Sequence, residues 1–272
     1  MKKKIIKKTL LTTAAFIVAI GILALAFLAY RYIKSEALQG PDAPLEITIE
    51  ELANDETTKA EPKINNLEPS TPSVHETSDE SPVPKSLNLE MPFYTQAPHS
   101  NWDYPWQEAC EEASVLLTAN LLLNMNLGLE DYNTELLRLV DWEMEYFGAY
   151  EHTDVHQTAE MLQINYGLDS VLHQNPTFED IQEILASGNL IIAPFAGKLL
   201  GNPNFRNGGP VYHMLVIKGY DAEAMQIVTH DVGTRNGSNY VYDWSVIENS
   251  LHSWHDDDIL LGEKTIIEVI TP

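Results

Sequence analysis

The stretch that decides the fold is Gln107–Ser114, QEACEEAS, where an extended approach turns into a helix. It contains Cys110, the only cysteine among the 272 residues. Small and apolar residues recur at helical spacing after it and predict a helix over 111–123. Cys110 would then lie at the helix N-terminus, where free N–H groups and the positive end of the dipole favour a thiolate. We therefore expect a reactive thiol with a lowered pKa; the alternative is an inert buried cysteine that packs as a small hydrophobe.

Two later residues could activate this thiol. His213 begins a predicted strand that runs to Asp221, directly after the glycine-containing loop 207–211. A neutral imidazole within hydrogen-bond reach can take the thiol proton and later give it to the leaving group. Asp231 ends the next predicted strand, and adjacent antiparallel strands would bring it beside His213 to fix the tautomer. Taken singly, His213 is also explained as a strand-edge histidine and Asp231 as a turn residue before Gly233.

The order of the predicted elements gives the fold class. Helical patterns come first and strand patterns separated by turn residues follow, which indicates an α+β domain with a mainly antiparallel sheet. The predicted helices are 111–123, 133–145, 156–166 and 178–187, and the predicted strands are 89–94, 190–195, 211–220, 225–230, 239–243 and 264–270.

Four motifs in this order resemble a known family. They are Met91–Pro98, Cys110–Ser114, His213–Asp221 and His230–Gly233, and together they look like the bacteriocin-processing-peptidase-like (family C39-like) cysteine peptidases. More narrowly, the chain resembles their stand-alone, extracytoplasmic bacterial relatives. The resemblance covers most of residues 89–243 and implies a papain-like fold.

The same resemblance implies residue roles. Cys110 would be the nucleophile, His213 the base and acid, and Asp231 the orienting residue. A glutamine upstream of the nucleophile would form the oxyanion hole with the Cys110 backbone N–H. Gln96 matches that position, and Gln107 is the alternative that spacing leaves open.

The chain departs from the transporter-fused members of that family in two ways. Glu111 follows the nucleophile where those members usually have glycine, and no ATP-binding or transporter domain accompanies the peptidase-like part. Cleavage after a double-glycine leader is therefore not inferred.

Metal and cofactor motifs are weak. His152 and His156 are four residues apart, but a zinc site needs three or four ligands, and a helix start capped near Asp154 explains the pair better. The run 252–258 is better explained as a solvated acidic turn than as a calcium site. No phosphate loop, Walker motif or dinucleotide fingerprint is present, so we expect neither a cofactor nor a metal.

The N-terminus predicts a membrane anchor. Five lysines within the first eight residues precede Thr9–Tyr30, 22 residues without a charge. As a helix this stretch would span about 33 Å, enough for a bilayer core, with the lysines on the cytoplasmic side. A cleaved signal peptide is the alternative, but its apolar region is typically about 7–15 residues long and ends at a small-x-small site, which 27–31 lacks. Residues 1–34 are therefore predicted to be a basic tail and a single-pass signal anchor in the cell membrane.

The rest of the chain would lie outside the cytoplasm. Residues 35–85 hold seven prolines and twelve acidic residues, and we predict a disordered linker there. Residues 86–272 form one domain of ordinary size. Beyond residue 34 the chain has 9 basic and 40 acidic residues, a net charge near −31, which argues against nucleic acid or anionic lipid as a partner.

These observations predict a membrane-anchored, extracytoplasmic cysteine hydrolase. It would cleave a peptide or isopeptide bond in a peptide or protein substrate through a thioester acyl-enzyme. Trp102 and Trp106 flank the nucleophile and could form one wall of a substrate groove. The alternatives are a cell-wall amidase of NlpC-like plan and a papain-fold binding domain without catalytic activity.

Overall fold

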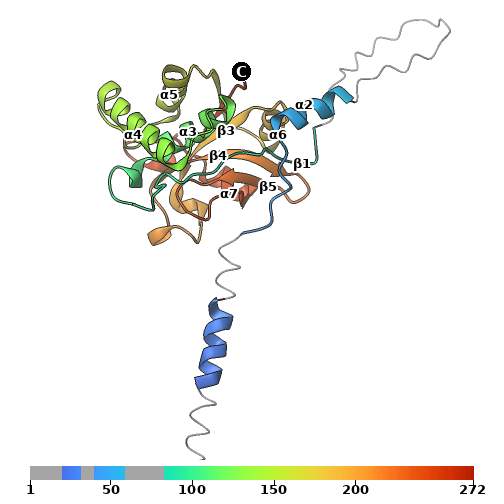
Figure 1. Cartoon of the computed structure of the whole chain (residues 1–272), viewed down its shortest axis with the longest axis vertical. Coiled ribbons are helices and arrows are strands. Elements are labelled where there is room, and N and C mark those ends of the chain that lie inside the picture. The colour runs from blue at the N-terminus through green and yellow to red at the C-terminus, as the bar shows by residue number, and fades with distance from the viewer. Residues whose placement is uncertain (1–19, 32–39, 59–82) are drawn as a thin grey trace, which may run out of the picture. The chain divides into compact units, whose positions relative to one another are not determined.

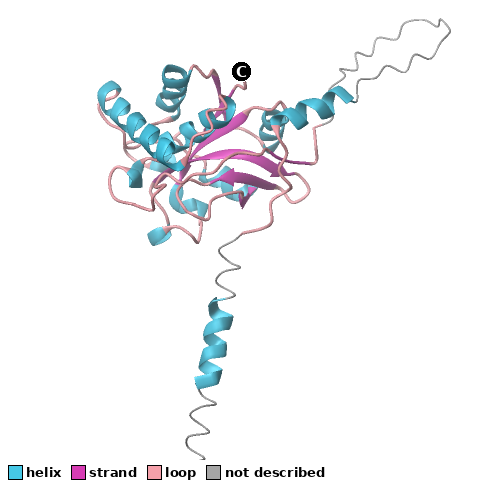
Figure 2. Cartoon of the chain, viewed as in Figure 1, coloured by secondary structure: helices cyan, strands magenta, loops and turns pink. Residues whose placement is uncertain are grey.

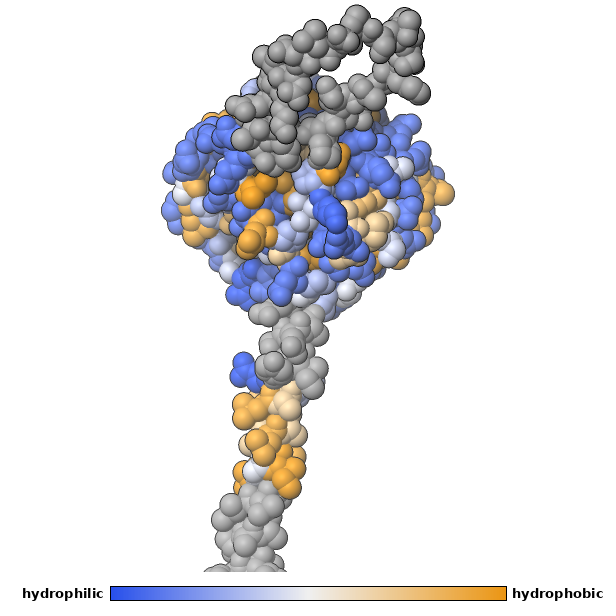
Figure 3. All heavy atoms as spheres, turned by 90° about the vertical axis from the view of Figure 1, so that its right-hand side faces the viewer, coloured by the Kyte–Doolittle hydropathy of each residue, from blue (hydrophilic) through white to orange (hydrophobic). Residues whose placement is uncertain are grey.

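The computed structural model describes residues 20–31, 40–58 and 83–272. The chain divides into two units at Gly40, and each is described by itself. In the first unit, residues 20–31 are helical and expose apolar side chains such as Leu23, Leu25 and Phe27, seen as the orange surface of this helix in Figure 3. No helix within the described residues is long and apolar enough to cross a membrane. Of the predicted span Thr9–Tyr30, residues 9–19 lie outside the described part of the chain.

The second unit has the predicted α+β character, with helices and sheet shown in Figures 1 and 2. Its helices are α2 (Ile49–Thr58), α3 (Cys110–Leu122), α4 (Leu129–Tyr146), α5 (Val155–Tyr166), α6 (Phe178–Ala186) and α7 (Trp244–Ser250). Short 3-10 turns are η1 (Trp106–Glu108), η2 (Gly197–Leu200), η3 (Arg206–Gly208) and η4 (Ile259–Leu261).

One antiparallel sheet of seven strands forms within residues 83–272, in the order β2-β7-β3-β4-β5-β6 with β1 beside β4. Its strands are β1 (Ser86–Asn88), β2 (Ser170–Gln174), β3 (Leu190–Ala196), β4 (Tyr212–Asp221), β5 (Gln226–His230), β6 (Tyr240–Asp243) and β7 (Thr265–Val269). The predicted strand 89–94 is absent: pairing in this region involves 86–88 instead, and Leu89 makes only a single bridge to Ile47.

Strand β4 is the centre of the sheet. It pairs with β3 along 212–217 and with β5 along 216–221, and β1 continues beyond the end of β3 along 219–221. All of its residues except Asp221 are buried. His213 therefore lies near one end of a strand that is held on both sides, which fixes its position against the rest of the domain.

Helix α3 is the central helix and packs against β4, with α4 and α5 packed against it in turn. All of its residues except Leu121 are buried, and a helix that is apolar on nearly every side is typical of a core position. A hydrogen bond also joins α3 to α4: the Tyr132 hydroxyl of α4 donates to the Ala113 carbonyl of α3 at 3.2 Å. Packing on all sides therefore places the first residue of α3, Cys110, against the sheet.

The structure differs from the predicted disordered linker over residues 40–58. Ile47 bridges Leu89, and its backbone bonds to Asn88 at 2.8 Å and to Glu90 at 2.7 Å. Glu46 forms an ion pair at 2.7 Å with Lys218. Helix α2 then buries its single leucine, Leu52, against the core. Residues 59–82 of the predicted linker lie outside the described part of the chain.

Candidate active site

Cys110 is the first residue of α3, as the sequence predicted. Its residue before the helix, Ala109, offers no side-chain cap, and the N–H groups of a first helical turn have no partner within the helix. The side chain is buried, and the backbone N–H of Met214 donates a hydrogen bond to the sulfur. This bond places Sγ next to the backbone of β4, one residue after His213.

The predicted lowering of the thiol pKa is not what the structure gives. Burial raises the pKa of the Cys110 thiol well above its ordinary value, and the charge of Glu111 raises it further. The thiol donates to Glu111 Oε2 at 2.9 Å. The hydrogen bond from Met214 acts in the opposite direction but is outweighed. Desolvation thus opposes the effect of the helix N-terminus on which the prediction depended.

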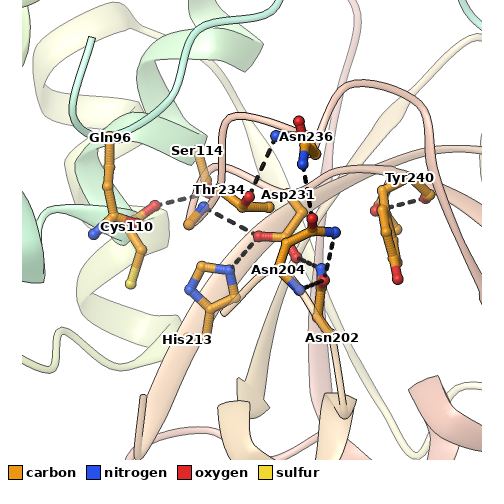
Figure 4. Close-up of polar contacts among 12 residues, drawn as sticks. Gln96, Cys110, Ser114, Asn202, Asn204, His213, Asp231, Thr234, Asn236 and Tyr240 are labelled. Carbon is orange, nitrogen blue, oxygen red and sulfur yellow. Dashed lines mark hydrogen bonds and ion pairs between the residues drawn. The ribbon is translucent and has the colours of Figure 1, made fainter. Parts of the chain in front are cut away.

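His213 and Asp231 are in direct contact, as predicted from their places on neighbouring strands. The His213 Nε2 atom lies 2.8 Å from Asp231 Oδ1, and both side chains are almost completely buried. Figure 4 shows the imidazole between Cys110 and Asp231, with its second nitrogen on the side of the sulfur. Phe205 packs edge-on against the ring, with centroids 5.3 Å apart.

Asp231 is held in the charged form by several donors. Its Oδ2 accepts from the Tyr242 hydroxyl at 2.6 Å and from Asn202 Nδ2 at 2.9 Å, and its Oδ1 also accepts from the Gly233 N–H at 3.0 Å. Burial alone would raise the Asp231 pKa, but the charge of His213 and these hydrogen bonds lower it below its ordinary value. An ionised Asp231 accepts only, so His213 Nε2 carries a proton, and in the neutral imidazole Nδ1 is the acceptor.

Sequence reasoning missed Tyr242 and Asn202. Tyr242 lies on β6, which pairs with β5, and Asn202 lies in the loop after η2. Neither belongs to a recognisable motif. The one available signal was the predicted strand 239–243; Tyr242 pairs there with Ile227, and its hydroxyl reaches Asp231 beyond the far end of β5.

The two candidate glutamines lie differently. Gln96 is buried, its backbone N–H bonds to the Val232 carbonyl at 3.0 Å, and its Nε2 donates to the carbonyls of Trp106 at 2.9 Å and Gln107 at 3.0 Å. Its Oε1 is buried without a hydrogen-bond partner. The Gln107 side chain is exposed and donates to Glu108 at 3.1 Å. Packing therefore fixes Gln96 and leaves Gln107 free to reorient.

A cavity of about 690 Å³ brings these residues together. Cys110 and His213 both line it, as do Gln96 and Gln107. Trp102 is also part of the lining, as expected for a groove wall, whereas Trp106 is not and instead donates to Asn133 at 2.9 Å. Cys110, His213 and the two candidate oxyanion donors thus face one solvent-accessible space.

The residues considered for metal binding have other contacts. His152 stacks on Trp254 with centroids 3.9 Å apart, and His156 pairs with Glu263 at 3.0 Å. Asp154 caps α5 in a reciprocal capping box with Gln157, which confirms the helix-start interpretation. His252 bonds to the Gly262 carbonyl at 3.1 Å.

Three carboxyl groups are buried near Cys110. They belong to Glu111 and Glu112 of α3 and Glu143 of α4, and Thr153 Oγ1 donates to Glu143 at 2.8 Å. Burial raises the pKa of Glu111 to about 8 and that of Glu143 to about 7, and it raises the pKa of Glu112 well above its ordinary value. The charge of Glu143 raises the pKa of Glu112 further, and neither carboxyl oxygen of Glu112 has a hydrogen-bond partner among the described residues.

Comparisons with known proteins agree with the predicted resemblance. A model described as the Peptidase_C39 like family matches residues 88–257, more than half of the chain. No curated protein matches. Among solved structures, a Bacillus anthracis protein described as a C39-like peptidase shares 13% sequence identity, over 69% of this chain and 98% of that chain, with a TM-score of 0.46. The predicted family and its α+β, papain-like fold are thereby confirmed, and the family match carries that conclusion.

Proposed function

Because this chain belongs to the Peptidase_C39 like family, we propose that it is a cysteine hydrolase that cleaves peptide or isopeptide bonds. Cys110 is the nucleophile, His213 the base and acid, and Asp231 the orienting residue. The observation that carries this proposal is the buried 2.8 Å contact of His213 with an ionised Asp231, beside a cavity that Cys110 also lines.

The reaction follows from the tautomer of His213. Nδ1 accepts the thiol proton while Sγ forms a bond to the scissile carbonyl carbon. As the carbon–nitrogen bond breaks, the imidazolium gives this proton to the leaving amine, and a thioester remains on Cys110. Water then attacks the thioester with His213 again as base, and the acid product leaves with the thiol restored. Asp231 keeps Nε2 protonated and stabilises the imidazolium in both steps.

We assign the oxyanion hole to Gln96 and the Cys110 backbone N–H. The N–H at the start of α3 has no partner within the helix, and Gln96 lines the same cavity as Cys110. The amide nitrogen contacts two carbonyls, so donation to an oxyanion exchanges one of these contacts. Gln96→Ala should lower kcat by about 10²–10³-fold, whereas Gln107→Ala should have a small effect. A larger loss at Gln107 would reverse the assignment.

A covalent probe and a proteomic comparison test the activity. A peptidyl electrophile should label Cys110 in the full chain, and His213→Ala should abolish labelling while the exposed His99→Ala does not. Peptides released from the wall and from secreted proteins should then differ between wild-type and Cys110→Ala cells. Labelling that survives in His213→Ala would overturn the assignment of the base. Release of wall fragments from purified wall would identify an amidase instead of a peptidase.

We also propose that residues 1–34 anchor the enzyme in the cell membrane with the catalytic domain outside the cytoplasm. The support is the uncharged stretch Thr9–Tyr30 behind five lysines. Protease added to intact spheroplasts should remove the catalytic domain, and the mature protein should keep its N-terminal lysines. A soluble form that begins near Tyr30 would identify a cleaved signal instead.

A further inference from the structure

The cations of this acidic domain are unevenly distributed. Residues 86–272 contain six lysines and arginines against 28 acidic residues. Three of the six are engaged: Arg138 pairs with Glu135, Lys218 pairs with Glu46, and Lys264 donates to the Glu248 carbonyl. The other three are Lys198, Arg206 and Arg235, which form no ion pair with any residue that the structure describes.

Two of these three cations line the active-site cavity. They are Arg206 and Arg235, both exposed, and among the described lining residues only Glu108 is acidic. Glu108 precedes Cys110 by two residues, so it belongs to the α3 side of the cavity. The ionised side chains that line the cavity therefore carry a net positive charge, whereas the domain as a whole has a large net negative charge.

Both arginines lie next to groups that touch the catalytic imidazole. Arg206 follows Phe205, whose ring packs edge-on against His213. Arg235 lies two residues after Gly233, where an added Cβ would come within 2.8 Å of His213 Cε1. The two loops are joined by Asn236 Nδ2, which donates to Asn204 Oδ1 at 2.7 Å. Both guanidinium groups are thus carried by one connected wall, on the His213 side.

We propose that Arg206 and Arg235 form a subsite for a carboxylate of the substrate, either an acidic side chain or a free α-carboxylate close to the scissile bond. Guanidinium groups bind carboxylates through charge-assisted, often bidentate hydrogen bonds. An acidic domain repels anionic peptides at long range, so two unpaired cations at the cavity supply local attraction where the substrate binds. This inference rests on the proposed function, since it names the substrate class of the same cavity.

Binding to a chain that cannot turn over tests the subsite separately from activity. Full-length Cys110→Ala is titrated with pairs of fluorescent peptides that differ only in Glu against Gln, or in a free against an amidated C-terminus. We expect the carboxylate member to bind about ten-fold tighter at low salt, with the preference shrinking as salt rises. Adding Arg206→Gln or Arg235→Gln should reduce this preference for the carboxylate peptide, and adding both changes should remove it.

Lys198→Gln is the matched control, because Lys198 is the third unpaired cation but does not line the cavity. Equal binding of the paired peptides, or a preference that survives the double arginine change, would overturn the subsite. A preference that Lys198→Gln removes equally would show a general charge effect and would also overturn it. Tight, arginine-dependent binding by Cys110→Ala without cleavage by wild type would keep the subsite and refute the proposed hydrolase. A preference in the Glu/Gln pair would identify an acidic side chain as the bound carboxylate, and a preference in the free/amidated pair would identify the C-terminal carboxylate.

A second, independent observation concerns the carboxyl group beside the nucleophile. Glu111 Oε2 lies 2.9 Å from Cys110 Sγ, and Glu111 Oε1 is buried without a partner. The charged or titratable groups around it are acidic: Cys110 and Glu112 on α3, Glu108 on η1, Glu143 on α4 and Tyr212 on β4. Burial among such neighbours favours the protonated form of Glu111.

We infer that Glu111 is a catalytic residue whose protonated carboxyl donates a hydrogen bond to the Cys110 thiolate. When Glu111 is ionised, it accepts the thiol proton and competes with His213 Nδ1 for it. When Glu111 is protonated, it can only donate, and the donation stabilises the sulfur anion after its proton has moved to His213. The raised pKa of Glu111, about 8, keeps it in the donating form at neutral pH.

Alkylation by iodoacetamide as a function of pH tests this role in the full chain. At pH 7, wild type and Glu111→Gln should react at similar rates, because the glutamine amide also donates, and Glu111→Ala should react about ten-fold more slowly. At pH 9, Glu111→Gln should react faster than wild type, because ionised Glu111 opposes the thiolate only in wild type. Glu145→Gln, an exposed change on α4 away from this cluster, is the control that should follow wild type. Equal rates for wild type and Glu111→Gln at pH 9, or for Glu111→Ala and Glu111→Gln at pH 7, would overturn the role.

Discussion

The buried carboxyls predict an unusual dependence of stability on pH, which Glu143→Gln isolates. Glu143 is buried in α4 and accepts from Thr153 at 2.8 Å, and its second carboxyl oxygen is buried without a hydrogen-bond partner. Burial raises its pKa from an ordinary 4.5 to about 7. The folded state therefore holds this proton more tightly than the unfolded state. The resulting stabilisation is fully present below pH 4.5 and is lost as the pH rises through about 7.

The magnitude follows from the size of the pKa shift. One pKa unit corresponds to about 1.4 kcal/mol. Raising the Glu143 pKa from 4.5 to about 7 therefore changes its contribution to the unfolding free energy by about 3 kcal/mol between pH 4.5 and pH 7. Glutamine keeps an oxygen that accepts from Thr153 and an amide that can donate to Glu112, but it does not titrate. The unfolding free energy of Glu143→Gln minus that of wild type should therefore rise by about 3 kcal/mol over this range.

Urea unfolding followed by tryptophan fluorescence from pH 4.5 to pH 8 measures this difference. His230, whose pKa burial lowers to about 4, gives a pH dependence of opposite sign, but it is present in both chains and cancels. Glu145→Gln, an exposed change in the same helix, is the control and should give a flat difference. A difference for Glu143→Gln that is constant or falls with pH would refute the reasoning.

Three further predictions concern packing around the site and the N-terminal segment. Tyr242→Phe removes a 2.6 Å hydrogen bond from Asp231 and should lower kcat/KM about ten-fold without unfolding the chain; unchanged kinetics would contradict the role of this bond. Gly233→Ala places a Cβ 2.8 Å from the His213 ring and should cost about 10²-fold in kcat, whereas Gly128→Ala, with only one atom within 4 Å, should not. Glu46→Gln leaves the buried Lys218 ammonium without its carboxylate and should reduce the urea-unfolding free energy by about 3 kcal/mol, while breaking the exposed Lys85–Glu223 pair should cost less than about 1 kcal/mol. Equal effects of these two changes would show that the pair does not fasten residues 40–58.

Elements with strong local patterns could be predicted from the sequence. The four predicted helices correspond to α3–α6, and β3–β7 were predicted within two residues of their ends. Strand β2 and helix α7 were missed because both are short, and β2 shows neither alternation nor a continuous apolar run. Residues 40–58 were missed for a different reason. Lys218, more than 150 residues away, holds this proline-rich and acidic segment in place, and no local pattern reveals that contact.

The site shows the same division between local and long-range information. Cys110, His213, Asp231 and Gln96 were chosen from motifs and predicted strand ends, and the structure brings them to one region of the fold. The direction of the thiol pKa was wrong, because a helix start is visible in the sequence whereas burial of the side chain is not. The contact of the Glu111 carboxyl with Cys110 Sγ could not be predicted either. From the sequence alone, a glutamate in the first turn of a helix could equally face solvent, and only the packing of α3 turns it toward the sulfur.

Burial of Cys110 has a consequence for its proposed role as the nucleophile. Packing α3 on every side fixes Sγ against β4, but the same packing removes the water that would stabilise a thiolate. The helix N-terminus and the Met214 N–H do not compensate for this loss, since the thiol pKa remains raised. In the proposed mechanism the thiolate therefore forms together with a neighbouring positive charge, which His213, backed by ionised Asp231, provides. A bound substrate excludes further water from the cavity, and the attraction between thiolate and imidazolium is stronger where water is absent. We therefore expect the thiolate to form as the substrate binds and to be scarce in the free enzyme.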